Sequence, residues 1–193
     1  VSLGQNWRAA IGPRPVWLAA STREGEEALV LEAWRKVGVR EALLVLVPRH
    51  PQRFEEVAGL LAGQGLNVVR RSKGLPEAGT QVWLGDSMGE MAAYFSLADL
   101  AFVGGSLLPL GGQNLIEAAA CACPVLVGPH TFNFLQATED AIAAGAARRV
   151  DDQAALGLAV DGLLRNRDEL AAMRQAASCF MQAHQGAGRR MLA

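Results

Sequence analysis

The sequence lacks the features that mark several large classes of protein. Its 193 residues include 18 basic and 19 acidic side chains, so the formal net charge is only −1. A nucleic-acid-binding domain normally gathers an excess of Lys and Arg on one face, and this balance argues against such a partner. No apolar run reaches the ~20 residues that a membrane-spanning helix needs. The composition therefore predicts a globular domain with a sizeable core and no nucleic-acid partner.

Cysteine is scarce, and the arrangement of the three residues excludes the usual cysteine sites. Cys121, Cys123 and Cys179 form an odd set without framework spacing, which predicts reduced thiols in a cytoplasmic protein. Cys121 and Cys123 form C-x-C, which is neither a C-x-x-C redox motif nor a zinc knuckle. No His, Cys, Asp and Glu residues have metal-ligand spacing, and no Ser-His-Asp set is evident. We expect no metal and no cofactor.

Short apolar runs alternate with amphipathic segments along most of the chain. Strands without internal polar residues are typical of a parallel sheet that is covered on both faces by helices. The pattern predicts an α/β fold with a doubly wound, Rossmann-like parallel sheet. The expected strands are "VWLAA" (16–20), "ALLVLV" (42–47), "LNVVRR" (66–71), "QVWLG" (81–85), "LAFVGG" (100–105), "PVLVG" (124–128) and "ARRV" (147–150).

The chain divides into three expected parts. Residues 1–15, with Pro13 and Pro15 and a Val at the first position, have the character of a linker between domains, so we expect a longer protein. Residues 16–164 form the Rossmann-like, nucleotide-binding domain. Residues 165–193 form a C-terminal helix that packs toward another domain. An exposed apolar stripe that includes Leu170 and Met173 is expected on this helix.

In a doubly wound sheet, ligands bind beyond the carboxyl ends of the strands, near the point where strand order reverses. The first strand is followed by "AASTREGEE", in which Ser21 and Glu24 match the capping box S-x-x-E. This match predicts a helix that begins at Ser21, whose free N–H groups suit an anion. An ordinary capped helix explains the same residues.

The next two junctions also carry polar side chains. In "LVPRHPQRF", Arg49 and His50 are held between two prolines, where they are able to meet a phosphate and a base, although a solvated turn is an equal alternative. In "WLGDSMGEM", the second capping box joins Ser87 to Glu90. The acidic Asp86 disfavours a phosphate at this turn and favours a ribose or a base. The glycines of the turn, Gly85 and Gly89, allow a close approach of the backbone.

The stretch "FVGGSLLPLGGQN" (102–114) is the richest in glycine. Gly104 and Gly105 follow a strand, and Gly111 and Gly112 precede an expected helix, from about Asn114 to Ala122, that carries Asn114 and Glu117. It is neither G-x-G-x-x-G nor a Walker loop. Backbone without Cβ atoms is able to approach a phosphate, and a carboxylate one turn later suits sugar hydroxyls. A further junction, "VGPHTFNF" (127–134), is explained as well by ordinary loop residues.

Together these junctions resemble the C-terminal half of the bacterial 3-deoxy-D-manno-octulosonic acid (Kdo) transferases. The resemblance rests on five motifs that occur in the family's order between residues 21 and 150. They are "STREGEE", "VPRHPQRF", "GDSMGE", "AFVGGSLLPLGGQNLIEAAA" and "PVLVGPHTFNF". Residues 151–193 match in helical character only.

The resemblance implies one half of a GT-B glycosyltransferase of lipopolysaccharide synthesis, in which this domain binds the donor CMP-Kdo. The family's N-terminal domain would bind the lipid A precursor, supply the catalytic base and associate with the cytoplasmic face of the inner membrane. None of those parts is in this chain, so we expect it to bind CMP and to transfer nothing alone. The implied donor-site residues are Ser21, Thr22, Arg23, Arg49, His50, Gly85, Asp86, Met88, Gly89, Glu90, Gly104, Gly105, Ser106, Gly112, Gln113, Asn114 and Glu117.

Two positions depart from the family pattern. Gln113 stands where the family has His, and Ala118 stands where it has Pro. Because Gln cannot become cationic, the resemblance leaves open how the leaving phosphate is supported from that position. Two other functions also stay open at this point: a UDP-sugar transferase or epimerase of the same fold, and a non-catalytic nucleotide-binding module.

Overall fold

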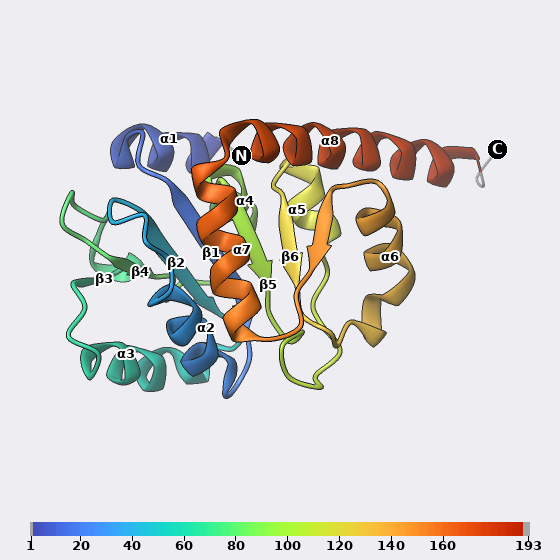
Figure 1. The fold of residues 1–193 in the computed structure, drawn as a ribbon. Coiled ribbons are helices and arrows are strands. Elements are labelled where there is room, and N and C mark those ends of the chain that lie inside the picture. The colour runs from blue at the N-terminus through green and yellow to red at the C-terminus, as the bar shows by residue number, and fades with distance from the viewer. Residues whose placement is uncertain (1, 191–193) are drawn as a thin grey trace.

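The computed structural model describes residues 2–190, which fold into a seven-stranded sheet with helices on both faces (Figure 1). The strand order is β3-β4-β2-β1-β5-β6-β7, and every neighbouring pair is parallel. This arrangement confirms the doubly wound, Rossmann-like fold. The strands are β1 (Val16–Thr22), β2 (Leu43–Pro48), β3 (Val68–Arg70), β4 (Val82–Leu84), β5 (Leu100–Val103), β6 (Val125–Val127) and β7 (Ala147–Arg149).

Two apolar clusters form the core, one on each face of the sheet. Side chains alternate between the faces, so Leu18 of β1 joins one cluster and its neighbours Trp17 and Ala19 join the other. Both faces need helices because the central strands carry almost no polar residue. The helices are α1 (Ser2–Ile11), α2 (Glu26–Trp34), α3 (Phe54–Ala62), α4 (Met91–Leu97), α5 (Ile116–Ala120), α6 (Leu135–Ala143), α7 (Gln153–Arg165) and α8 (Arg167–Arg190).

The expected linker over residues 1–15 instead contains helix α1, which packs into this domain. Trp7 is buried, and its ring lies 5.0 Å from the rings of both Trp83 and Tyr94. Gly4 allows this close packing, because a Cβ there would lie 2.3 Å from the carbonyl oxygen of Ala93 in α4. Pro13 and Pro15, which suggested a linker, lie in the turn between α1 and β1 and do not extend into the helix.

The prediction of an exposed apolar stripe on the last helix is wrong. In α8, Met173, Ala177 and Phe180 are all buried, and Leu170 is half-buried. Met173 joins the core on the α7 side of the sheet, whereas Ala177 and Phe180 join the core on the other side. The helix thus crosses one end of the sheet, along the upper edge in Figure 1, and closes both cores. Residues 191–193 of the expected helical segment lie outside the described residues.

Candidate functional site

A hollow of about 200 Å³ lies at the carboxyl ends of β2, β1 and β5. The chain builds the sheet outward from β1 in one direction and then returns to add β5 on its other side. The pair β1 and β5 is therefore the point where strand order reverses, which is where doubly wound sheets bind their ligands. The walls come from the loops that lead into α4 and α5.

The structure brings together about half of the residues predicted for the site. They come from four junctions that are far apart in the sequence and meet only because the strands are parallel. The predicted residues that line the hollow are Ser21, Arg49, Met88, Gly89, Glu90, Gln113, Asn114 and Glu117.

Apolar side chains that the sequence reading missed form the floor of the hollow. Tyr94 and Phe95 of α4 are buried beneath it, and Phe134 lines one side. Burial raises the pKa of Tyr94 to about 12, so its hydroxyl stays protonated in the physiological range. The helical spacing of Tyr94 and Phe95 marks them as core residues, and no sequence signal shows that part of this core opens into a pocket.

The end of β1 has an unusual backbone. Ser21 has φ 55°, in the left-handed region, and the register with β2 shifts between Ala20 and Thr22. A non-glycine residue in that region costs about 1 kcal/mol or more, and such conformations gather at functional sites. Gly104, the residue after β5, faces this bulge, where a Cβ would lie 2.4 Å from the Ser21 carbonyl oxygen. Glycine at position 104 therefore lets the bulged strand end reach the wall of the hollow.

Neither predicted capping box forms. Helix α2 begins at Glu26, after Gly25 with φ 86°, and it has no side-chain cap. Ser21 is still part of β1, so it is too early in the chain to cap this helix. Helix α4 begins at Met91, also without a side-chain cap. There the hydroxyl of Ser87 instead donates a hydrogen bond to the carboxylate of Glu90.

Three predicted residues at the first two junctions lie away from the hollow. The hydroxyl of Thr22 is buried and donates to the Glu27 carboxylate at 2.9 Å. Arg23 is half-buried and does not line the hollow, and the exposed His50 does not line it either. His50 has an extended backbone and directly precedes the single turn of helix at Pro51–Arg53.

The glycine-rich stretch forms hydrogen bonds within itself and with the loop that follows β6. The Ser106 hydroxyl is buried, donates to the Val103 carbonyl at 2.5 Å and accepts the Gly128 N–H at 2.9 Å. The N–H of Gly112 donates to the Gly105 carbonyl at 2.7 Å. Gly105, Ser106 and Gly112 thus hold the loop in shape, and the residues that follow, Gln113 and Asn114, line the hollow.

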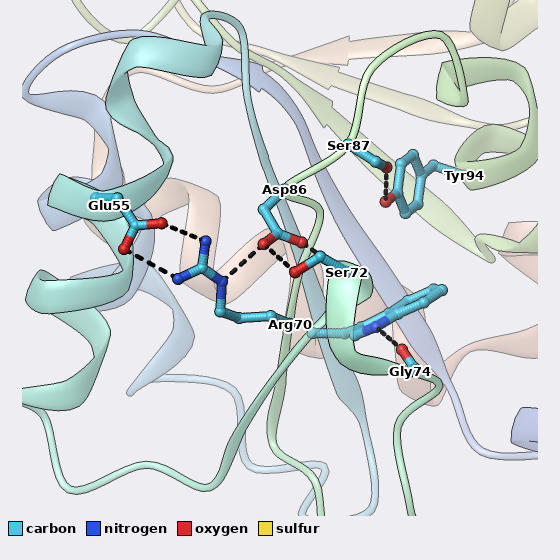
Figure 2. A network of polar contacts seen from close by, with 8 residues as sticks. Glu55, Arg70, Ser72, Gly74, Asp86, Ser87 and Tyr94 are labelled. Atoms are coloured by element: carbon cyan, nitrogen blue, oxygen red, sulfur yellow. Dashed lines mark hydrogen bonds and ion pairs between the residues drawn. The ribbon is translucent and has the colours of Figure 1, made fainter.

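The carboxylate of Asp86 is occupied by partners outside the hollow (Figure 2). It accepts hydrogen bonds from the Arg70 guanidinium at 2.7 Å and from the N–H and hydroxyl of Ser72 at 2.8 and 2.6 Å. Burial opposes ionisation, but these donors outweigh it and lower the pKa of Asp86. The preceding Gly85 packs against Val47 and Tyr94. Both residues shape the loop but do not line the hollow.

Glu90 is the polar group at the other end of this loop. Its carboxylate pairs with Arg71, with the nearest N–O distance 2.9 Å, and accepts the Ser87 hydroxyl. The Arg71 guanidinium in turn lies 4.9 Å from the centre of the Trp7 ring, which is a cation–π distance. Helix α1 thus supports Arg71, and Arg71 holds the carboxylate that lines the hollow.

The comparisons with known proteins point to a single family. A 3-deoxy-D-manno-octulosonic acid transferase of Bordetella pertussis is 50% identical over 98% of this chain, and one of Haemophilus influenzae is 40% identical over 93%. The crystal structure of the C-terminal CMP-Kdo binding domain of WaaA from Acinetobacter baumannii is 34% identical. It matches with a TM-score of 0.86 over 94% of this chain and 95% of that one.

The chain belongs to the 3-deoxy-D-manno-octulosonic acid transferase family. It spans about half the length of the curated relatives, 46% and 43% of the two named above. Its sheet and helices correspond to one half of the GT-B fold. No family model matches the chain.

Residues 2–190 contain neither a metal-binding cluster nor a membrane-spanning helix. No three His, Cys, Asp or Glu side chains in this part of the chain gather in a metal-binding arrangement. Over the same residues, no helix is both long and apolar enough to cross a lipid bilayer.

Proposed function

We propose that this chain is the donor-binding domain of a Kdo transferase and binds CMP-Kdo in the hollow beside β1 and β5. One observation carries the proposal: the hollow lies at the switch point of a chain that is 34% identical to the CMP-Kdo binding domain from Acinetobacter baumannii over 95% of that domain. Identity at that level over the whole domain supports a common ligand as well as a common fold.

The charges around the hollow fit a nucleoside monophosphate. Arg49 is the one cationic residue among the described residues that line it, and its side chain is exposed. We assign Arg49 to the phosphate, because a guanidinium forms paired hydrogen bonds with phosphate oxygens. Glu117 lies across the hollow and is also exposed, and we assign its carboxylate to sugar hydroxyls.

The backbone contribution differs from the one expected from the sequence. The Gly112 N–H is used by the Gly105 carbonyl, so it is not free to meet a phosphate. The N–H groups of Gln113 and Asn114 have no hydrogen-bond partner among the described residues, and both residues line the hollow. We assign phosphate contact to these two N–H groups.

The activity of the whole protein belongs to the same proposal. We expect the full-length transferase to move Kdo from CMP-Kdo to a lipid A precursor, with CMP as the leaving group. Preorganised N–H and guanidinium donors would stabilise the charge that develops on that phosphate. The acceptor site, the catalytic base and contact with the cytoplasmic face of the inner membrane are assigned to the half of the protein outside this chain.

Calorimetric titration of the chain with CMP, UMP and AMP tests the proposal. We expect CMP to bind with a dissociation constant near the micromolar-to-millimolar range, because half of the enzyme is absent, and we expect UMP and AMP to bind more weakly. The cytidine assignment fails if CMP does not bind or if UMP binds more tightly.

A further inference from the structure

Glu26 is a buried carboxylate at the start of α2 that connects two of the loops around the hollow. Its side chain has no exposed surface. One oxygen, Oε2, accepts the N–H of Gly105 at 2.5 Å and the N–H of Arg23 at 3.0 Å. The other oxygen, Oε1, accepts the N–H of Leu107 at 3.1 Å. A single side chain thus binds the loop after β1 and the glycine-rich loop after β5.

Stability alone is a poor explanation for this residue. No Lys, Arg or His within the described chain pairs with Glu26, whereas its neighbour Glu27 pairs with Arg53 at 2.6 Å. Burial raises the pKa of Glu26, and the three backbone N–H donors oppose that effect. A carboxylate buried without a cation is costly, so its position near a ligand site calls for another role.

The bonds from Glu26 lead directly to residues that line the hollow. Gly105 has φ 73°, and its carbonyl accepts the N–H of Gly112 at 2.7 Å. Gln113, the next residue, lines the hollow and lies so close to Gly105 that a Cβ there would be 3.3 Å from Gln113 Nε2. On the other side, Arg23 follows the bulge that places Ser21 in the wall.

We propose that Glu26 is a positioning residue that fixes the glycine-rich loop for nucleotide binding, a role that rests on the donor-binding function proposed above. The carboxylate touches no ligand itself. It holds Gly105 and Leu107 in place, so that Gln113 and Asn114 present their N–H groups to the hollow before the nucleotide arrives. Such preorganisation lowers the entropy that binding must overcome.

The test compares two variants at adjacent, equally buried positions. Glu26→Gln keeps the size of the side chain but replaces one acceptor oxygen with an NH₂ group that faces backbone N–H donors. Glu27→Gln is the matched control: it also removes a buried charge, but the hydrogen bonds of Glu27 go to Thr22 and Arg53 rather than to the glycine-rich loop. We expect Glu26→Gln to weaken CMP binding about tenfold, the equivalent of one charge-assisted hydrogen bond, and Glu27→Gln to weaken it less than twofold.

A spectroscopic readout separates positioning from loss of stability. In ¹⁵N-labelled protein, we expect the amide signals of Gly105 and Leu107 to shift upfield and exchange faster in Glu26→Gln, and to stay unchanged in Glu27→Gln. Equal CMP affinity in wild type and Glu26→Gln would overturn the proposal. Equal losses of affinity in both variants would also overturn it, because stability would then explain the effect.

Two further outcomes are decided by the wild-type chain. If Glu26→Gln does not fold, the test is the hydrogen-exchange rate of the Gly105 and Leu107 amides in the wild-type chain. Protection like that of the core strands supports the proposal, and exchange as fast as at the exposed Leu75 refutes it. If the wild type does not bind CMP, the donor-binding function fails and the positioning role fails with it. If the wild type binds CMP and Glu26→Gln binds equally well, only the positioning role fails.

Discussion

Arg70 and Asp86 form an ion pair between the outermost strand β3 and the loop after β4, with Nε and Oδ2 2.7 Å apart. The Asp86 side chain is 1% exposed, and the same guanidinium also binds the exposed Glu55 of α3, with the nearest N–O distance 2.6 Å. Figure 2 shows the three side chains in a line, with Ser72 on the far side of Asp86. The pair fastens the short edge strand to the loop that forms part of the wall of the hollow.

Replacing Asp86 with Asn should lower the free energy of unfolding at pH 7 by about 1–3 kcal/mol, because a buried charge-assisted pair is lost. The folded pKa of Asp86 lies below its ordinary value of 3.8, so its contribution is present above that pH and is lost as the pH falls through the folded pKa. Urea unfolding at pH 7 and pH 3 measures the effect. The difference between wild type and Asp86→Asn should shrink at pH 3; an equal difference at both values would contradict this account. Asp151→Asn, at an exposed position, is the control.

Arg49→Ala and Glu117→Ala should each weaken CMP binding about tenfold, since each removes one hydrogen-bonding group from the pocket. Both side chains are exposed, so the unfolding midpoint should stay within the error of the wild type. Arg40→Ala and Glu41→Ala remove the same charges before the start of β2, at the opposite end of the sheet. Calorimetric titration with CMP should show no change in these two controls. Unchanged affinity in both pocket variants would show that the site lies elsewhere.

Gly104→Ala should cost about 2–3 kcal/mol of stability, because the added Cβ would lie 2.4 Å from a backbone oxygen that has little room to move. The same variant should weaken CMP binding, since Ser21 would be displaced from the wall.

Gly59→Ala should have the opposite effect on stability. Gly59 lies in helix α3 with nothing within 4 Å of an added Cβ, so alanine should raise stability by about 0.5–1 kcal/mol. Thermal and urea unfolding of the two variants should therefore differ in sign.

Met173→Ala should destabilise the isolated chain by about 2–5 kcal/mol, because Met173 is buried in this domain's own core. Leu158→Ala on α7 is the control, since Leu158 is 68% exposed, and it should change stability by less than about 0.5 kcal/mol. Urea unfolding of both variants is the measurement. If Met173→Ala were neutral, the side chain would not be packed on the sheet, and the exposed stripe expected from the sequence would be correct after all.

Much of this protein follows from local sequence patterns. The apolar runs at 42–47 and 100–105 predict buried parallel strands, because only a sheet covered on both faces tolerates strands without polar residues. The parallel arrangement then brings the strand ends to one edge. That rule was sufficient to place Arg49, Gln113 and Glu117 near one another although they are far apart in the chain.

Other features depend on contacts between residues that the sequence does not relate. Asp86 and Arg70 are adjacent only because β3 pairs with β4, and a polar residue after a strand gives no indication of which partner it will meet. The partners of Glu26 are equally unpredictable, because in the sequence it is one acidic residue among several in "REGEE". Trp7 and Met173 have core-like character, but whether their helices pack on this domain or on another is a question of tertiary contact.

The sequence by itself determined the fold class, the edge of the sheet that carries the pocket and the family. Strand and helix periods, glycine positions and motif order are local properties, and local sterics and solvation decide them. Only the tertiary structure decided which polar residues face the hollow and which are used to hold the loops. That choice depends on which hydrogen-bond partners long-range packing brings within about 3 Å, and no local pattern encodes it.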